Sequence, residues 1–232
     1  MIKFDKVSKK FGEIVALDEV SFKVDKGELF FLTGPSGAGK TTLIKLILGE
    51  YLPSSGEIEI NGEVVNEIPR KKLYLFRRKL GVVFQDYKLF WNKTVAENVA
   101  LPLEIQGAKE SEIKEKVEKI LGVVGLSERT ELFPSQLAGG ELQRTVLARA
   151  VITGPELLLA DEPTGNLDPK TSAGMMKLFK EINEQGTTVL MATHNSEVVD
   201  SLQARVIELD KGKVIRDEKK GKYFKEKSKS KS

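Results

Sequence analysis

The sequence has 232 residues, a length that favours one compact domain with an added lobe. Its 40% apolar and 31% charged residues are typical of a folded globular chain and exclude a disordered or fibrous protein. It contains no cysteine and a single histidine, His194, which excludes disulfide frameworks, thiolate zinc sites, cysteine nucleophiles and histidine-rich metal sites. The formal net charge is +3, but residues 219–232 hold seven lysines and one glutamate, so residues 1–218 carry −3.

A slightly acidic folded part argues against a general nucleic-acid-binding surface. No stretch approaches the roughly 18 consecutive apolar residues of a transmembrane helix. The first residues, MIKFDKVSKKFG, lack the apolar core of a signal peptide. We therefore do not expect the chain to form a membrane pore by itself.

The first predicted elements surround a glycine-rich turn. Residues 20–24 and 28–33 have the composition of strands, and the second of these runs directly into the turn. Residues 43–48 follow as an apolar, buried helix. Residues 57–65 read EIEINGEVV, in which Asn61-Gly62 matches the two-residue turn of a β-hairpin.

The second half of the chain alternates helices and strands. Residues 85–149 have a mainly helical sequence pattern, and a capping box at Thr94 and Glu97 marks a helix start. Residues 157–160 and 187–191 are short apolar strands separated by a helix, which favours parallel pairing, and a second hairpin is predicted over residues 206–215. We predict an α/β fold with a mostly parallel sheet, an antiparallel β subdomain and an inserted helical lobe. The predicted domain spans residues 1–218 with its lobe at about 86–153, followed by a basic, disordered tail at 219–232.

A phosphate-binding loop is the most specific motif. The residues GPSGAGKT satisfy the pattern G-x-x-x-x-G-K-[ST] between a predicted strand and a predicted helix. Its glycines allow backbone N–H groups to surround phosphates, Lys40 adds a positive charge, and the Thr41 hydroxyl suits Mg²⁺. The loop comprises Gly34, Pro35, Ser36, Gly37, Ala38, Gly39, Lys40 and Thr41.

Two carboxylates, Asp161 and Glu162, follow the strand predicted at residues 157–160. Ligands of open α/β sheets bind at the carboxyl ends of the strands. Asp161 there suits a Mg²⁺ contact through water, and Glu162 is placed to polarise an attacking water. An acidic pair at a helix start is the alternative interpretation.

A small-residue turn, LAGGE at residues 137–141, opens a long helix and taken alone could be an ordinary helix start. Together with the other two motifs it resembles the nucleotide-binding subunits of ABC transporters, and the resemblance covers nearly the whole chain. It implies an ATPase that uses Mg²⁺. The implied roles are adenine stacking for Phe11, phosphate binding for the loop through Thr42, catalysis for Glu162, His194 and Gln85, metal contacts for Thr41, Gln85 and Asp161, a D-loop at Asp168, and the signature at Leu137, Ala138, Gly139, Gly140 and Glu141.

One residue departs from the family pattern. The signature usually carries serine where this chain has Ala138, and that hydroxyl would reach the γ-phosphate of ATP on the other subunit. Losing one hydrogen bond to a charged group is worth roughly 1.5–3 kcal/mol. We expect weaker ATP sandwiching or slower turnover rather than inactivity.

The family resemblance also implies partners. A signature completes the ATP site of the opposite subunit, so a head-to-tail homodimer is expected. Residues 80–90, 160–169, 192–195 and 205–217 are most similar to the cell-division group of the family. That group implies an integral membrane partner, a peripheral place on the cytoplasmic face of the cell membrane at the division septum, activation of cell-wall hydrolases, and no bound nucleic acid.

Three other functions fit parts of the sequence. Lipoprotein-release and macrolide-export ATPases of the same family share EPTGNLD at residues 162–168. The other two are a DNA-associated ABC-type ATPase and a regulatory module that binds ATP without hydrolysing it. The aromatic stretch at Tyr87, Leu89, Phe90 and Trp91 is a candidate partner groove or part of the lobe's core. Basic residues between 70 and 79 predict an amphipathic helix with a solvated face.

Overall fold

The structure, a computed structural model, describes residues 1–223. Its strands are β1 (Ile2–Phe11), β2 (Ile14–Val24), β3 (Leu29–Thr33), β4 (Ser55–Ile60), β5 (Glu63–Val64), β6 (Leu80–Val83), β7 (Leu157–Asp161), β8 (Thr188–Ala192), β9 (Arg205–Asp210) and β10 (Lys213–Glu218). Its α-helices are α1 (Lys40–Ile47), α2 (Leu73–Arg77), α3 (Val95–Ile105), α4 (Glu110–Val123), α5 (Gly139–Val151), α6 (Pro169–Glu184) and α7 (Ser196–Leu202). None of these helices is long and apolar enough to cross a membrane.

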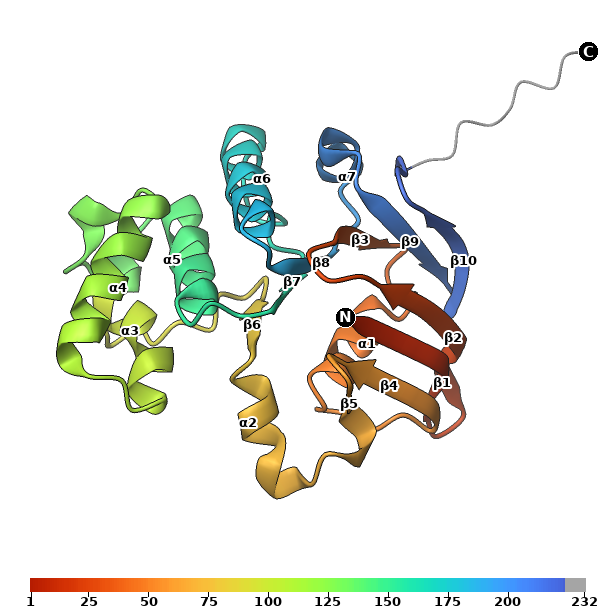
Figure 1. Ribbon diagram of the computed structural model, residues 1–232. Coiled ribbons are helices and arrows are strands. Elements are labelled where there is room, and N and C mark those ends of the chain that lie inside the picture. The colour runs from red at the N-terminus through yellow and green to blue at the C-terminus, as the bar shows by residue number, and fades with distance from the viewer. Residues whose placement is uncertain (224–232) are drawn as a thin grey trace, which may run out of the picture.

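A six-stranded sheet forms the centre of the molecule (Figure 1), in the order β10-β9-β3-β8-β7-β6. The five strands from β9 to β6 are parallel, and β10 joins β9 as an antiparallel hairpin. Strands β3, β7 and β8 are almost wholly buried because other elements cover both faces of the sheet, which explains their uninterrupted apolar sequences. The predicted parallel core is confirmed.

A second sheet is antiparallel and has the order β2-β1-β4-β5. The turn between β4 and β5 places Asn61 at φ 50° and Gly62 at φ 79°, the pair of positive values that a two-residue hairpin turn requires. Sequence analysis missed β1, whose residues KFDKVSKKF carry too many lysines for a strand signal. Helix α1 is buried between the two sheets in a core cluster that includes Phe4, Phe22 and Phe30.

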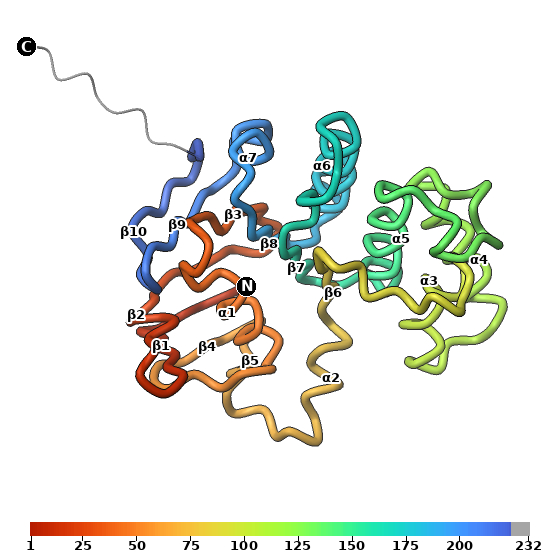
Figure 2. The backbone as a smooth tube through the Cα atoms, turned by 180° about the vertical axis from the view of Figure 1, so that it is seen from behind, coloured from red at the N-terminus to blue at the C-terminus, as the bar shows by residue number. Residues whose placement is uncertain are grey.

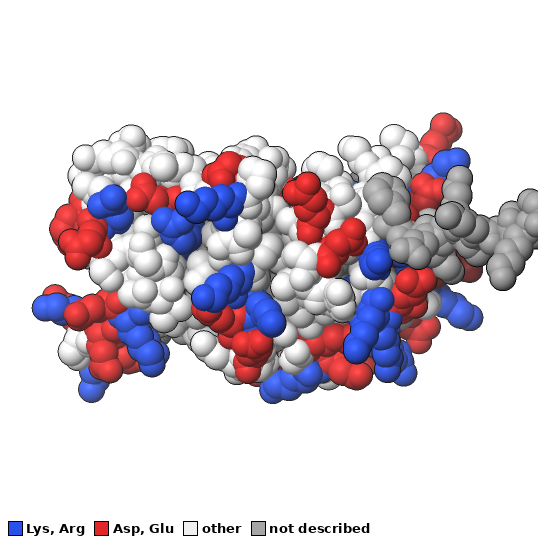
Figure 3. Space-filling model, turned by 90° about the horizontal axis from the view of Figure 1, so that it is seen from above, with Lys and Arg blue, Asp and Glu red and all other residues white. Residues whose placement is uncertain are grey.

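The opposite face of the parallel sheet is covered by α5, α6 and α7 around a second cluster. Helices α3, α4 and α5 pack around a third cluster that includes Val99, Leu121 and Ala148 and form a lobe beside the sheet, seen from behind in Figure 2. Because α5 contributes to both clusters, it fixes the lobe against the core. Seen from the side of α6 and α7, positive and negative side chains are interspersed, and the upper edge of the view is mostly uncharged (Figure 3).

The structure differs from two sequence expectations. The basic stretch between residues 70 and 79 is a 3₁₀ turn over Arg70–Lys72 and the short α2, and Leu80 lies in β6, where it pairs with Leu157. Pairing with a buried parallel strand overrides the helical pattern at that point. Residues 219–223, predicted as part of the tail, are held by hydrogen bonds to the folded domain, while the rest of the predicted tail lies outside the described residues.

Candidate functional site

A cavity of about 750 Å³ opens at the carboxyl ends of the parallel strands β3, β7 and β8. This edge of the sheet is where open α/β folds bind ligands. The cavity brings together residues that are distant in the sequence: Ile14, Val15, Ala16, Pro35, Ser36, Gly37, Gly39, Lys40, Thr41, Thr42, Gln85, Asp161, Glu162, His194 and Tyr223.

The first and last glycines of the loop after β3, Gly34 and Gly39, have no room for a side chain. A Cβ on Gly34 would lie 2.1 Å from the Leu209 carbonyl oxygen, and Gly34 has a φ of 135°. Lys40, the first residue of α1, donates from Nζ to the carbonyl oxygens of Gly34 at 2.7 Å and Pro35 at 3.1 Å. The ammonium is thereby held over the loop beside the start of α1, where the helix dipole also favours a phosphate.

Thr41 and Asp161 are in contact across this cavity. The Thr41 hydroxyl donates to the Asp161 carboxylate at 3.1 Å, joining the end of the loop to the end of β7. Hydroxyl and carboxylate oxygens are the ligands that Mg²⁺ prefers, and Mg²⁺ commonly takes only one or two carboxylates together with substrate phosphates. The pair therefore fits the metal role that the sequence assigns to it. Burial raises the pKa of the Asp161 carboxyl, while the Thr41 hydrogen bond and nearby lysines oppose that rise.

This raised pKa predicts that Asp161 costs stability at neutral pH. A carboxyl whose folded-state pKa lies above its unfolded value stabilises the fold only while it is protonated, so stability falls as the pH rises through the folded pKa. We expect Asp161→Asn to raise the melting temperature at pH 7 by roughly 2–4 °C. In thermal melts across pH, the gain should disappear below the ordinary aspartate pKa of 3.8. A variant that is less stable than the parent at pH 7 would contradict this prediction.

Glu162 and His194 form the second pair in the cavity. The Glu162 carboxylate lies 2.6 Å from His194 Nδ1 and accepts hydrogen bonds from the His194 backbone N–H at 3.1 Å and the Thr193 hydroxyl at 3.1 Å. Glu162 has a φ of 49°, a left-handed conformation that is strained for a residue other than glycine. The end of β8 holds it there, because its own N–H donates to the Ala192 carbonyl at 2.9 Å. Strain at a carboxylate in a cleft is typical of a functional site.

Of the two predicted loop residues Gln85 and Asp168, only Gln85 lines the cavity within the described residues. Gln85 lines the cavity after β6, and its side-chain nitrogen lies 3.2 Å from the position that a Cβ on Gly165 would take. Asp168 caps α6 by accepting from the Thr171 backbone N–H at 3.0 Å and from the Thr171 hydroxyl. These hydrogen bonds lower the pKa of Asp168.

The residues of the LAGGE turn lie elsewhere. Ala138 is the N-cap of α5, and Glu141 accepts from its backbone N–H at 2.9 Å and pairs with Arg129 at 2.8 Å. Leu137, Gly139 and Gly140 complete the turn, but within residues 1–223 none of the five lines the cavity. One chain therefore brings together the glycine loop, both carboxylates and His194, while the start of α5 is not part of the cavity wall within the described residues.

Ala138 cannot accept the hydrogen bond that an N-cap side chain usually provides, because a methyl group has no acceptor. We expect Ala138→Ser to stabilise the fold by about 0.5–2 kcal/mol through this cap. If the start of α5 also contacts a nucleotide on another subunit, the same change should tighten ATP binding and raise the ATPase rate. Denaturant unfolding and steady-state ATPase assays measure the two effects separately. An unchanged ATP affinity and ATPase rate would contradict the nucleotide role of this position.

Phe11 is placed differently from the other predicted ATP-site residues. Its ring is 41% exposed and meets Tyr51 edge to face with centroids 5.1 Å apart, and it is not among the residues that line the cavity. It pairs with Ile14 across the β1–β2 hairpin, so it lies next to the wall formed by Ile14, Val15 and Ala16. Adenine stacking by Phe11 stays a prediction.

Sequence reasoning missed two parts of the cavity wall, which are the β2 residues 14–16 and Tyr223. It also missed Thr193, a buried residue whose hydroxyl donates to Glu162. Thr193 directly precedes His194, so the neighbouring motif could have suggested it. Nothing in the local sequence around Tyr223 indicates that the chain returns to this cavity after β10.

Comparison with known proteins agrees with the geometry. Residues 17–165 match the family described as ABC transporter. The chain is 46% identical to the "Cell division ATP-binding protein FtsE" of Mycobacterium tuberculosis over 96% of this chain and 98% of that protein, and 46% identical to that of Escherichia coli over 91% and 96%. Among solved structures it is similar to "MJ0796, a Bacterial ABC Transporter Cassette", a dimer, with a TM-score of 0.87 and 37% identity over 95% of this chain and 99% of that chain. A post-hydrolysis dimer of the same cassette, bound to ADP and Pi, gives a TM-score of 0.86 and 36% identity, also over 95% and 99%.

Proposed function

Because the chain belongs to the ABC transporter family and is an ATPase of that family, we propose that it works as a head-to-tail homodimer that closes on two ATP molecules. The observation that carries this proposal is the separation of the start of α5 from the cavity within one chain. Gly139 and Gly140 carry the first backbone N–H groups of the 13-residue helix α5, and the start of a helix attracts a phosphate. Both structures of the similar cassette MJ0796 are dimers, which supports this arrangement.

In this proposal the chain's own residues divide the reaction between them. Lys40 and the loop N–H groups bind the phosphates, and Thr41, Asp161 and Gln85 would hold Mg²⁺, which neutralises phosphate charge when bound. Glu162 orients the attacking water and receives its proton. His194 Nδ1 lies 2.6 Å from the Glu162 carboxylate and holds it in place. When ATP is bound, the His194 side chain contacts the γ-phosphate. Phe11 stacks on the adenine.

We further propose that the dimer acts on an integral membrane partner, as in complexes of the FtsE–FtsX type. The names of the similar cell-division proteins support this assignment. ATP-driven closure would then be transmitted through the membrane to cell-wall hydrolases at the septum, and the chain would lie at the cytoplasmic face of the membrane through its partner. Arrested cell separation after depletion of the protein, and co-purification of a membrane protein without a solute pathway, test this proposal. Recovery of a solute permease instead would favour the lipoprotein-release or macrolide-export alternative.

A groove between the core and the helical lobe is the proposed partner site. It measures about 350 Å³ and lies between α2, β6, α3 and α5. Its apolar wall includes Leu101, Pro102 and the 58% exposed Ile105, while Arg77 and Arg78 line the other side. Apolar surface beside cationic groups fits an amphipathic helix with acidic residues, so we assign the groove to a cytoplasmic helix of that kind from the membrane partner. Of the predicted aromatic stretch, Leu89 is buried in the core, whereas Phe90 and Trp91 are 48% and 57% exposed.

Two substitutions distinguish the groove from the aromatic stretch. Ile105→Asp places a negative charge in the groove and should reduce recovery of the membrane partner in pull-downs by about tenfold, the size of effect expected at an interface anchor. Val123→Asp, at an exposed residue of α4, is the matched control. If Trp91→Ala weakens partner binding and Ile105→Asp does not, the partner instead binds the residues that follow Gln85.

A further inference from the structure

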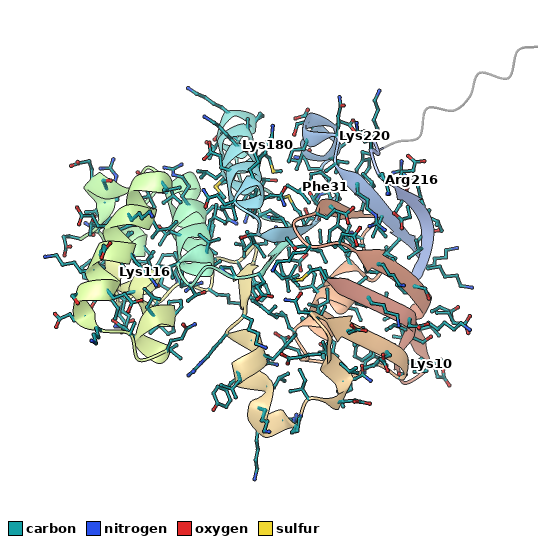
Figure 4. The ribbon with its side chains drawn as sticks, in the orientation of Figure 1. Lys10, Phe31, Lys116, Lys180, Arg216 and Lys220 are labelled. Atoms are coloured by element: carbon teal, nitrogen blue, oxygen red, sulfur yellow. The ribbon has the colours of Figure 1, made fainter. Side chains whose placement is uncertain are left out.

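The C-terminal side of the ATP cavity is formed by a segment that follows the last strand. After β10 ends at Glu218, residues 219–223 turn back toward α7, and Tyr223 reaches the cavity, whose wall it shares with Glu162 and His194. In Figure 4 the two labelled residues of this region, Arg216 on β10 and Lys220 near α7, mark the path of the chain. Tyr223 thus belongs to the end of the cavity that carries the water-activating carboxylate.

Arg216 fixes this segment. Its side chain is only 8% exposed, and its Nη1 and Nη2 donate to the carbonyl oxygens of Lys222 and Tyr223, each at 2.7 Å. Its Nε donates to the Glu208 carboxylate at 2.7 Å, so the guanidinium is anchored to β9 while it holds the segment. A guanidinium presents several donors in a rigid plane, which suits this simultaneous contact with three groups.

Three further contacts determine where Tyr223 lies. Its backbone N–H donates to the Asp200 carboxylate of α7 at 2.7 Å. The Gly221 N–H donates to the Ala204 carbonyl at 3.1 Å, and a Cβ on Gly221 would lie 2.7 Å from the Val206 side chain, so only glycine allows this close approach. Residues 219–223 are therefore held by contacts with β10, α7 and the residues at the start of β9, so this segment is fixed to the folded domain.

The Tyr223 side chain is placed between the apolar core and the acidic part of the cavity. Its ring packs against the core cluster that contains Val199 and Val206. Burial, followed by the carboxylates of Glu208 and Glu162, raises the pKa of its phenol. A phenol is already neutral at pH 7, and the rise in pKa acts in the same direction.

We propose that Tyr223 is a positioning residue of the ATPase. Its ring completes the wall behind Glu162 and His194 and restricts where the attacking water and the two side chains can lie. Arg216 acts through Tyr223 by fixing residues 219–223. This inference rests on the proposed roles of Glu162 and His194. It gives the segment after β10 a role in hydrolysis.

The test separates catalysis from nucleotide binding in the full chain. We expect Tyr223→Ala to lower kcat about tenfold, the order of loss expected when reacting groups are displaced by a fraction of an ångström, and to change the ATP Kd less than about twofold. Tyr223→Phe keeps the ring and should restore kcat to within about twofold of the parent. Ile215→Ala, at a 59% exposed neighbour of Arg216 on β10, is the control for shortening a side chain in this region.

Two deletions extend the test. Removing residues 219–232 should reproduce the loss seen with Tyr223→Ala, and removing residues 224–232 should preserve kcat. A folded Tyr223→Ala variant with the parent kcat overturns the proposal, as does an equal loss of affinity and rate in Tyr223→Phe. If Tyr223→Ala does not fold, Tyr223→Leu decides by the same criteria. Glu162→Gln distinguishes a wrong role for Tyr223 from a wrong role for Glu162. This variant keeps full activity only if Glu162 does not activate the attacking water.

Discussion

Glu162→Gln should reduce ATP hydrolysis by at least about a hundredfold while ATP binding is retained. A glutamine side chain keeps one oxygen to accept from the His194 N–H and Nδ1, and its amide can donate to the Thr193 hydroxyl, so the strained backbone at residue 162 keeps its support. What it loses is the carboxylate that receives the proton of the attacking water. The variant should therefore accumulate as an ATP-bound dimer, measured by size-exclusion chromatography with ATP and Mg²⁺ and by single-turnover hydrolysis.

Glu184→Gln is the matched control, because Glu184 is an exposed carboxylate near the end of α6 that pairs only with Lys180 within the described residues. It should hydrolyse ATP at the parent rate. Parent-like hydrolysis by Glu162→Gln would show that another group activates the water. A variant that remains monomeric with ATP would argue against closure on the nucleotide.

Gly139→Asp should abolish hydrolysis without disturbing the fold. Gly139 is the first residue of α5, and a Cβ there would meet only the Tyr87 hydroxyl at 3.5 Å and Leu167 at 4.0 Å, which are ordinary contacts. An acidic side chain in the first turn of a helix is favourable by about 0.3–1 kcal/mol, so thermal stability should be retained. The same charge would repel a phosphate that arrives from a second subunit, and we expect at least about a hundredfold loss of ATPase activity with nucleotide binding to the isolated chain preserved.

Gly174→Asp serves as its control, because a Cβ on Gly174 of α6 meets no atom within 4 Å. ATPase assays measure the loss of activity in the two variants, and thermal melts show whether both remain folded. Full ATPase activity of Gly139→Asp would show that the start of α5 does not contact the nucleotide.

The parts of the site that could be predicted from sequence are those where one local motif carries its own geometry. The loop from Gly34 to Thr41 needs glycine-rich backbone between a strand and a helix, and Asp161 and Glu162 follow an apolar strand whose end must lie at the same sheet edge. Parallel pairing of β3, β7 and β8 then brings the two motifs together, as the Thr41–Asp161 hydrogen bond shows.

The parts that could not be predicted depend on contacts between distant segments. The hydrogen bonds from Thr193 and His194 to Glu162 require the exact register of β7 and β8 and a left-handed backbone at residue 162, which no propensity indicates. Tyr223 enters the cavity because Arg216 on β10 and Asp200 on α7 hold its segment, and the lysine-rich composition there suggested disorder instead. Residues 70–79 had a helical pattern, but Leu80 pairs with Leu157 and continues as a strand.

In the proposed dimer each ATP site is built from two chains, and an experiment that mixes two inactive variants tests this arrangement. Lys40→Ala removes the ammonium held over the phosphate loop, and Gly139→Asp blocks the start of α5, so neither protein alone should hydrolyse ATP. In a mixed dimer one site carries both defects and the other carries none. An equal mixture should therefore regain roughly a quarter of the parent activity, since half of the dimers are mixed and each has one intact site. A mixture as inactive as its two components would show instead that the loop and the start of α5 serve the same chain.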